Sequence, residues 1–291
     1  LPASLAQKYI RIKRVKVNGG RAQRDQRLQE GDVLQLYIND EFFDKPSEEN
    51  MFLTLFKPRL TVVYEDEHLL LADKPQGMVV HADETEKVNT LINHIQAYLY
   101  QKREWNPKWE NAFTPALCNR IDRNTGGIVI AAKNAETLRI INKKIRDREI
   151  DKRSLYIPVG APKPPKGRVQ VFLVKDEKKK EVSVRDQPVP GGKTAITHYE
   201  TLDRRGELSL VEVGLETGRT HQIRVHMASI GHPLLGDGVY GAPCPEKGLE
   251  GQCLHARRLK FIHPRTGQLV RLEAPLPEYF TQVISRLGNE I

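Results

Sequence analysis

The segment Ala116–Ala132 joins a polar stretch, two glycines and an apolar run, a succession that constrains the fold more than any other part of the chain. The apolar run Ile128–Ala132 predicts a buried strand. Asp122 stands just before it, between Arg120 and Arg123. A carboxylate at a turn supported by a core strand is held where chemistry is usually done, and the arginines favour its ionised form. The alternative is an ordinary turn aspartate.

The chain has 291 residues and is basic, with a net charge of +9. A basic globular chain most often binds a polyanion, either nucleic acid or anionic lipid. No apolar run approaches the ~18 residues that span a bilayer, and the first residues lack a signal-peptide pattern. Three cysteines, Cys118, Cys244 and Cys253, suit a reducing compartment. We therefore expect a cytoplasmic protein that has no membrane segment.

Residues 1–38 predict a small basic module. Their pattern favours a helix over Ser4–Ile12, a strand over Val15–Val17, a tight turn at Asn18-Gly19 and a strand over Val33–Ile38. The module carries eight Lys or Arg residues against three Asp or Glu residues. Five of these cations lie on the helix, on the first strand or between the two: Lys8, Arg11, Lys13, Arg14 and Lys16. Such a cluster either contacts phosphates without reading sequence or forms a solvated face.

Residues 39–60 begin with an acidic stretch that predicts a linker. Residues 61–291 predict a second domain, with helices over Lys87–Gln101 and from an N-cap at Asn134 to about Arg148. Short alternating runs within it predict an antiparallel meander over Arg168–Val174, Glu181–Arg185, Thr194–Leu202 and Leu208–Leu215. A last strand and a C-terminal helix complete the expected domain.

Another helix is expected after Gly218, with Thr220 as its N-cap and Gly231 at its end. The helical period places Ile223, Met227 and Ile230 on one face and turns Arg224 and His221 away from it. We therefore expect the Arg224 side chain to face a cleft and not the core, and a guanidinium there can form a bidentate pair with a carboxylate. The alternative is a surface ion pair, which is usually worth little.

Two possible ligand motifs are set aside. Gly236-x-Gly238-x-x-Gly241 has the spacing of a dinucleotide loop, but no helix follows it and no βαβ unit surrounds it. Four residues that bind zinc in other proteins follow, with no paired-ligand spacing: Cys244, Cys253, His255 and His263. We expect neither a cofactor nor a metal.

The segment Asn119–Gly127 resembles the catalytic signature of RluA-type pseudouridine synthases, although Asn119, Ile121 and Gly126 differ from the family's usual residues. The resemblance continues in order through Asp73–Gly77, Lys152–Tyr156, Gly218–His226 and Leu254–Leu259, and it spans about Thr61 to Pro277. It implies an α+β fold. In that fold, a mixed, mostly antiparallel central sheet is flanked by helices and preceded by the basic module.

The resemblance implies the isomerisation of uridine to pseudouridine in RNA without a cofactor. Asp122 would be the catalytic carboxylate and would either attack C1′ or remove the 2′ proton. Arg224 would pair with Asp122, and Tyr156 would stack on the uracil, although a lone strand tyrosine is more often a packing residue. The target base must be flipped out of the RNA. Arg120 would fill the vacated stack or hold the flanking phosphate.

Other residues of the matching motifs are expected at the same site. Leu254 and Leu259 would line the base pocket. Further RNA contacts are expected from Arg123, Arg219 and His221, in addition to the cations of the basic module.

Arg14–Gly19 followed by Leu28–Val33 resembles the RNA-binding domain named after ribosomal protein S-four. That domain usually has another helix before this point, so the module is expected to be incomplete at its start. Within the family, such a module favours large-subunit ribosomal RNA as substrate, with tRNA as an alternative. We expect a monomer. The rival interpretations are a catalytically inactive ribosome-assembly factor and a hydrolase that releases free uracil.

Overall fold

The computed structural model describes residues 3–38, 50–109, 113–176, 181–241, 249 and 251–287. The chain divides into two compact units, the first made of Leu1–Leu60 and His81–Ala112 and the second of Thr61–Val80 and Phe113–Ile291. The predicted boundary at residue 60 coincides with a boundary between units, whereas residues 81–112 join the first unit. Residues 39–49 of the predicted linker lie outside the described residues.

The basic module forms one helix and a small sheet. The helix α1 (Ala3–Arg11) precedes an antiparallel sheet in the order β2 (Gly20–Arg21), β1 (Val15–Val17), β3 (Leu34–Leu36). Asn18 and Gly19 have φ angles of 49° and 81°, which the tight turn requires. The Asn18 amide donates to Asp32 at 2.7 Å, and its carbonyl accepts the Val33 N–H at 2.8 Å. The predicted helix, first strand and turn of this module are present, whereas the predicted strand Val33–Ile38 is shorter, because β3 covers only Leu34–Leu36.

A short 3-10 helix, η2 (Met51–Thr54), and the helix α2 (Leu91–Gln101) also belong to the first unit. The prediction started the second of these helices at Lys87, which is wrong. Thr90 is its N-cap, and the Thr90 side chain accepts the Asn93 N–H at 3.3 Å. The capping side chain therefore sets where this helix begins.

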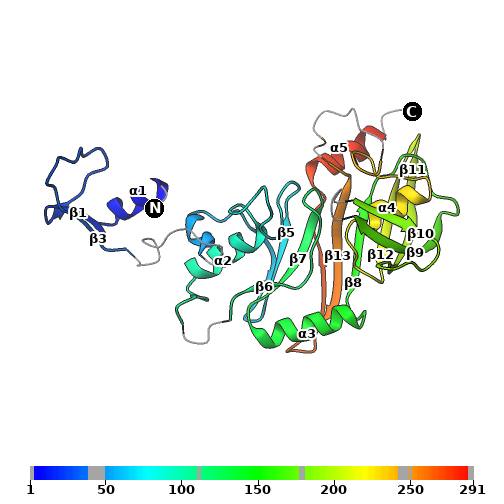
Figure 1. Ribbon diagram of the computed structural model, residues 1–291, viewed down its shortest axis with the longest axis horizontal. Coiled ribbons are helices and arrows are strands. Elements are labelled where there is room, and N and C mark those ends of the chain that lie inside the picture. Colours follow the sequence, from blue (N-terminus) through cyan, green and yellow to red (C-terminus); the bar gives the residue numbers. More distant parts are fainter. Residues whose placement is uncertain are drawn as a thin grey trace. The chain divides into compact units, whose positions relative to one another are not determined.

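The second unit is built on an 11-stranded sheet (Figure 1). The strands follow the order β10-β9-β11-β12-β8-β13-β7-β5-β4, with β14 paired to β13 and β6 paired to β7. Their bounds are β4 Thr61–Glu65, β5 Leu69–Lys74, β6 Ala116–Leu117, β7 Gly126–Ala132, β8 Asp151–Tyr156, β9 Lys166–Asp176, β10 Glu181–Arg185, β11 Lys193–Arg205, β12 Leu208–Leu215, β13 Leu254–Ile262 and β14 Leu269–Glu273. Among these described strands only β13 and β7 pair in parallel. The predicted mixed, mostly antiparallel sheet is confirmed.

The four strands β9 to β12 are antiparallel as predicted, but they do not follow one another across the sheet. β11 pairs with β9 instead of with β10. β10 is five residues long and β9 is eleven, so β9 offers a longer edge for the thirteen-residue β11. The hairpin β9–β10 therefore ends at the sheet's edge, and β11 joins it to β12.

Three described helices flank this sheet: α3 (Ala135–Arg146), α4 (Gln222–Ser229) and α5 (Glu278–Leu287). Asn134 caps α3 as predicted, because its side chain accepts the Thr137 N–H at 2.9 Å. α3 contributes Ile141 to the core beneath β5, β7 and β13, and α4 contributes Ile223 and Met227 to the core over β8, β9 and β12. None of the described helices is both long and apolar enough to cross a membrane.

The strand β7 is buried along its whole length and lies between β5 and β13 (Figure 1). Gly127, its second residue, has a φ of 117°, and a Cβ there would stand 2.3 Å from the Ala256 carbonyl oxygen. Only glycine fits such a close backbone approach. The loop that carries Asp122 therefore ends at a tightly packed position of the sheet.

Candidate active site

Asp122 lies in the loop between β6 and β7, and Arg224 lies on α4. The structure brings them together: Arg224 Nη1 stands 3.4 Å from Asp122 Oδ2. The Arg224 side chain is 8% exposed and that of Asp122 is 27% exposed. The contact thus joins a buried guanidinium to a carboxylate that solvent, or a substrate, can reach.

Asp237 forms the stronger pair with Arg224, and the sequence reasoning missed it. Arg224 Nε and Nη2 donate to the two Asp237 oxygens at 2.7 and 2.8 Å, a bidentate geometry. The backbone N–H groups of Val239 and Tyr240 donate to Asp237 Oδ1 at 3.1 and 3.2 Å. Burial alone would raise the pKa of Asp237, but these bonds and the Arg224 charge lower it. Asp237 therefore fixes the guanidinium, which turns its remaining face to Asp122.

The helix that carries Arg224 begins differently from the prediction. The N-cap is His221, in the left-handed region at φ 53°, and not Thr220. The His221 side chain makes no capping bond to this helix. His221 Nδ1 instead lies 2.8 Å from the Tyr240 hydroxyl. The expected core face is present, since Ile223 and Met227 pack in one cluster.

Tyr240 links three parts of this site. Its ring centroid lies 5.0 Å from the Arg224 guanidinium carbon and 5.5 Å from the His221 ring. Its hydroxyl accepts the Val182 backbone N–H at 2.8 Å. A cation over an aromatic face is attracted by the ring's quadrupole. The Tyr240 ring face thus packs against the Arg224 guanidinium, and the Tyr240 hydroxyl contacts His221.

A buried lysine holds the other side of the Asp122 loop. Lys74 is fully buried at the end of β5, and its Nζ donates to the carbonyls of Pro75, Met78 and Arg123 at 2.9, 2.7 and 2.9 Å. Burial lowers the pKa of Lys74 to about 7, although the nearby charge of Asp122 opposes this shift. The Arg123 carbonyl belongs to the residue after Asp122, so Lys74 anchors the loop where the carboxylate projects.

Tyr156 is placed in the core and not on an open surface. It has no exposed area, packs with Val211 and Met227, and donates its hydroxyl proton to Met227 Sδ at 2.8 Å. Burial raises the pKa of this phenol. Leu254 lies opposite Tyr156 in the same cluster, whereas Leu259 belongs to the core under α3. A stacking role for Tyr156 requires a neighbouring side chain to move, and it stays a prediction.

The predicted RNA-contacting arginines near the site are exposed. Arg120 and Arg123 flank Asp122 on the loop, and Arg219 precedes α4 with its Nε donating to the Thr194 carbonyl at 3.1 Å. In the first unit, Lys8, Arg11, Lys13 and Arg14 are exposed, and the half-buried Lys16 stands over the Tyr37 ring at 5.3 Å. Their contacts with RNA stay predictions.

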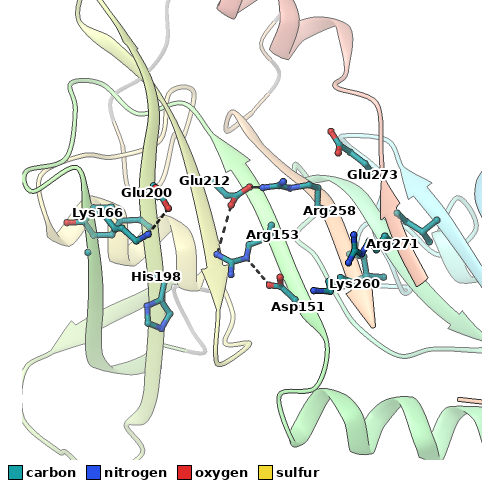
Figure 2. Close-up of a pocket in the computed structure, with 14 residues that line it drawn as sticks. Asp151, Arg153, Lys166, His198, Glu200, Glu212, Arg258, Lys260, Arg271 and Glu273 are labelled. Atoms are coloured by element: carbon teal, nitrogen blue, oxygen red, sulfur yellow. Dashed lines mark hydrogen bonds and ion pairs between the residues drawn. The ribbon is translucent and has the colours of Figure 1, made fainter. Parts of the chain in front are cut away.

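A hollow of about 930 Å³ lies on the other face of the sheet, lined by β8, β9, β11, β12, β13 and β14 (Figure 2). Val211 and Val213 pack towards α4, so the alternating Glu212 points away from it and into the hollow. The lining has five Lys or Arg residues against four Asp or Glu residues. Figure 2 shows Arg153 between Asp151 and Glu212, and its side chain lies 2.8 Å from the first and 4.0 Å from the second. The hollow holds neither Asp122 nor its partners, so we assign it no catalytic role.

The possible zinc residues do not gather in one place in the described structure. Cys253 is buried with α5, whereas His263 lies 2.8 Å from Asp66 near the turn between β4 and β5. Within the described ranges no group of three or more His, Cys, Asp or Glu side chains could hold a metal ion. Cys244 lies outside those ranges.

The cluster around Asp122 suits acid–base or nucleophilic chemistry. An arginine stays charged in proteins and does not exchange its proton. Arg224 can therefore pair with the Asp122 carboxylate and orient it, but cannot act as the acid or the base. The carboxylate itself is the reactive group.

Comparison with known proteins gives related chains along most of the length. Residues 68–229 match the family model described as RNA pseudouridylate synthase. An uncharacterised RNA pseudouridine synthase of Bacillus subtilis, YlyB, is 34% identical over 97% of this chain and 88% of its own. The ribosomal large subunit pseudouridine synthase D of Zymomonas mobilis is 39% identical over 75% of this chain and 70% of its own.

A solved structure agrees with the fold. Human RNA pseudouridylate synthase domain containing 4 superposes with a TM-score of 0.64 at 23% identity, over 79% of this chain and 94% of that one. At this identity the likeness concerns the fold, which is the mixed sheet with its flanking helices.

Proposed function

The chain belongs to the RNA pseudouridylate synthase family, isomerases that act on RNA, and we propose that it converts specific uridines of large-subunit ribosomal RNA with Asp122 as its catalytic carboxylate. The contact of 3.4 Å between Asp122 and the buried Arg224 carries the proposal. The ribosomal substrate is supported by the similarity to the synthase D of Zymomonas mobilis. A tRNA substrate is the alternative.

The reaction rearranges atoms that the nucleotide already holds. The C1′–N1 bond breaks, the uracil turns, a C5–C1′ bond forms, and the C5 proton is lost while N1 gains one. Asp122 either attacks C1′ and is displaced by C5, or removes the proton from C2′ as the uracil leaves and returns it to C2′ when C5 bonds to C1′. In both routes Arg224 pairs with the carboxylate and orients it towards the sugar. Asp237 keeps Arg224 in place.

The RNA must present its target outside the stack, because an enclosed base leaves no access to C1′. Arg120 is exposed beside Asp122, where it fills the vacated stack or holds the flanking phosphate. Tyr156 stacks on the uracil once its ring is uncovered, with Leu254 beside it. Arg123 and Arg219 contact the neighbouring backbone. The S-four-like basic module adds affinity that depends on salt.

The experiment is pseudouridine mapping, by carbodiimide labelling and reverse-transcription stops, on ribosomal and transfer RNA. It compares cells lacking the protein with cells complemented by wild type, Asp122→Asn or Asp151→Asn. We expect ribosomal stops that are lost without the protein and return with wild type and Asp151→Asn only. Asp151 is the matched control because it pairs with an arginine in the hollow on the other face.

Other outcomes revise the proposal in defined ways. Restored stops in tRNA alone would replace the ribosomal substrate. An unchanged map in every strain would favour the inactive assembly factor, and released uracil would favour the hydrolase. Stops restored by Asp122→Asn would remove the catalytic role of this carboxylate.

A further inference from the structure

The active-site cluster contains one side chain that the reaction scheme does not use. His221 stands at the start of α4 with a φ of 53°, three residues before Arg224. Left-handed backbone is uncommon for residues other than glycine, and histidine is one of the few that adopt it more often than the rest. Its ring is half-buried at the Asp122 site and is held on one side by Tyr240. The bond to Tyr240 and the nearby charges of Asp122 and Arg224 place the ring within the reactive cluster.

The hydrogen bonds of Tyr240 determine which nitrogen of His221 carries the proton. The Tyr240 oxygen already accepts the Val182 N–H at 2.8 Å, so its own single proton is free to donate. The acceptor is His221 Nδ1, at 2.8 Å. A neutral imidazole that accepts at Nδ1 carries its proton on Nε2. No described residue hydrogen-bonds to His221 Nε2, which is also absent from the buried polar atoms that lack a partner. The geometry therefore leaves an accessible N–H donor at the site.

The surroundings keep this imidazole neutral. Burial lowers the pKa of His221, and the Arg224 charge lowers it further, while Asp122 opposes the shift. The charged groups that face the ring are Asp122, Arg224, Asp237 and Lys175, with the Tyr240 phenol on the remaining side. The two carboxylates and two cations around this ring leave no excess positive charge to attract a phosphate, so a neutral N–H donor there suits an uncharged oxygen.

We propose that His221 donates a hydrogen bond from Nε2 to a carbonyl oxygen of the target uracil, and that Tyr240 is the positioning residue that fixes this tautomer, an inference that rests on the proposed function. When the C1′–N1 bond breaks, the uracil leaves with negative charge spread over N1 and its carbonyl oxygens. A preorganised N–H directed at such an oxygen stabilises the charge as it develops. The donor keeps its proton throughout, so His221 is the same before and after the reaction.

The first test needs no RNA. Long-range ¹H–¹⁵N correlation spectra of the histidine-labelled full chain report which ring nitrogen is protonated, and His221→Gln identifies the His221 signals. We expect Nδ1 of wild type to be unprotonated and Nε2 to be protonated. Tyr240→Phe keeps the ring beside Arg224 and removes the hydroxyl, so it should shift His221 towards a mixture of tautomers. A wild-type spectrum with the proton on Nδ1 would overturn the proposal.

The second test measures single-turnover rates and RNA affinity with the target RNA. His221→Asn suits the left-handed backbone and can keep the Tyr240 bond, but its short amide does not reach the Nε2 position. His221→Gln reaches it. We expect His221→Asn to slow the chemical step by about 100-fold with little change in Kd, His221→Gln to recover a large part of that loss, and Tyr240→Phe to slow the step by about 3- to 10-fold.

The outcomes separate this inference from the proposed function. A change in Kd alone, with an altered salt dependence, would mean that His221 contacts a phosphate, and it would overturn the proposal. Equal loss in the Asn and Gln variants would overturn it as well, because it would indicate a structural role. If the wild-type protein itself left the RNA unmodified, the proposed function would fail. The NMR spectra would still show, independently of activity, which nitrogen of His221 is protonated.

Discussion

Two arginine–aspartate pairs with nearly equal Nε–oxygen distances lie on opposite sides of the same sheet. Arg224 donates through Nε to Asp237 at 2.7 Å, and Arg153 donates through Nε to Asp151 at 2.8 Å. The first pair is 8% and 0% exposed, and the second is 41% and 48% exposed. Distance alone would rank the two pairs together. Burial separates them, because only the first pair has given up its water and depends on its partner for charge balance.

The comparison predicts its largest effect at Asp237. Asp237→Asn leaves the Arg224 charge buried without its main partner, which should cost about 3–5 kcal/mol of unfolding free energy. Activity should fall as well, since the guanidinium loses the support that aims it at Asp122. Because Arg224 lowers the pKa of Asp237 below 3.8, the stabilisation exists above that pH and is lost as the pH falls through the lowered value.

Urea unfolding curves of wild type and Asp237→Asn at several pH values measure this difference. The two curves should begin to converge below about pH 3.8, where the unfolded chain takes up a proton, and should meet only when the pH passes the lowered pKa of folded Asp237. A loss below about 1 kcal/mol at neutral pH, the size typical of an exposed pair, would contradict the distinction by burial.

A smaller effect is expected at Lys74, the cation that anchors the Asp122 loop. Lys74→Met removes the donor from three carbonyls, which should cost about 1–3 kcal/mol at neutral pH. Burial lowers the pKa of Lys74 from 10.5 to about 7, so between these values the unfolded chain binds more protons than the folded one. Wild-type stability should therefore rise with pH across that window, and the variant should lack this rise.

The measurement is the urea midpoint from pH 7 to 10.5, with the exposed Lys260→Met as the control. Lys260→Met should follow the wild-type curve. If wild type and Lys74→Met changed in parallel, the buried lysine would not be the titrating group. The turnover of Lys74→Met should also fall, since the Arg123 carbonyl is released.

The sequence predicts those parts of the site that depend on local chemistry. Three features follow from a few neighbouring residues each, and the structure contains all of them: the buried strand residues Ile128–Ala132, the helix cap at Asn134 and the tight turn at Asn18. The pattern on α4 also turned Arg224 out of the apolar face. Local rules place the N-cap of this helix at Thr220, whereas the structure has His221 there. His221 is in a left-handed conformation, and no sequence pattern before the helix indicates it.

The missing parts depend on contacts between distant segments. Asp237 and Tyr240 lie in the segment after α4, and a glycine-rich stretch with one acid and one aromatic looks like an ordinary turn. Their partners become visible only when the segment folds back on Arg224. Likewise, the sequence Lys74-Pro75 indicates only the end of a strand, although the Lys74 ammonium group holds the loop of Arg123. Sequence spacing contains no signal for such pairings.

The smallest effect is predicted for the exposed member of the comparison. Asp151→Asn should change the unfolding free energy by less than about 1 kcal/mol, because solvent screens the Arg153 charge once the carboxylate is gone. The change should shrink further when salt is raised, since an exposed pair is screened within about 8 Å at physiological ionic strength, whereas the loss in Asp237→Asn should hardly respond. A double-mutant cycle with Arg153→Met isolates the pair energy. An exposed pair worth several kcal/mol and insensitive to salt would show that the network around Glu212, and not burial, governs the strength of these pairs.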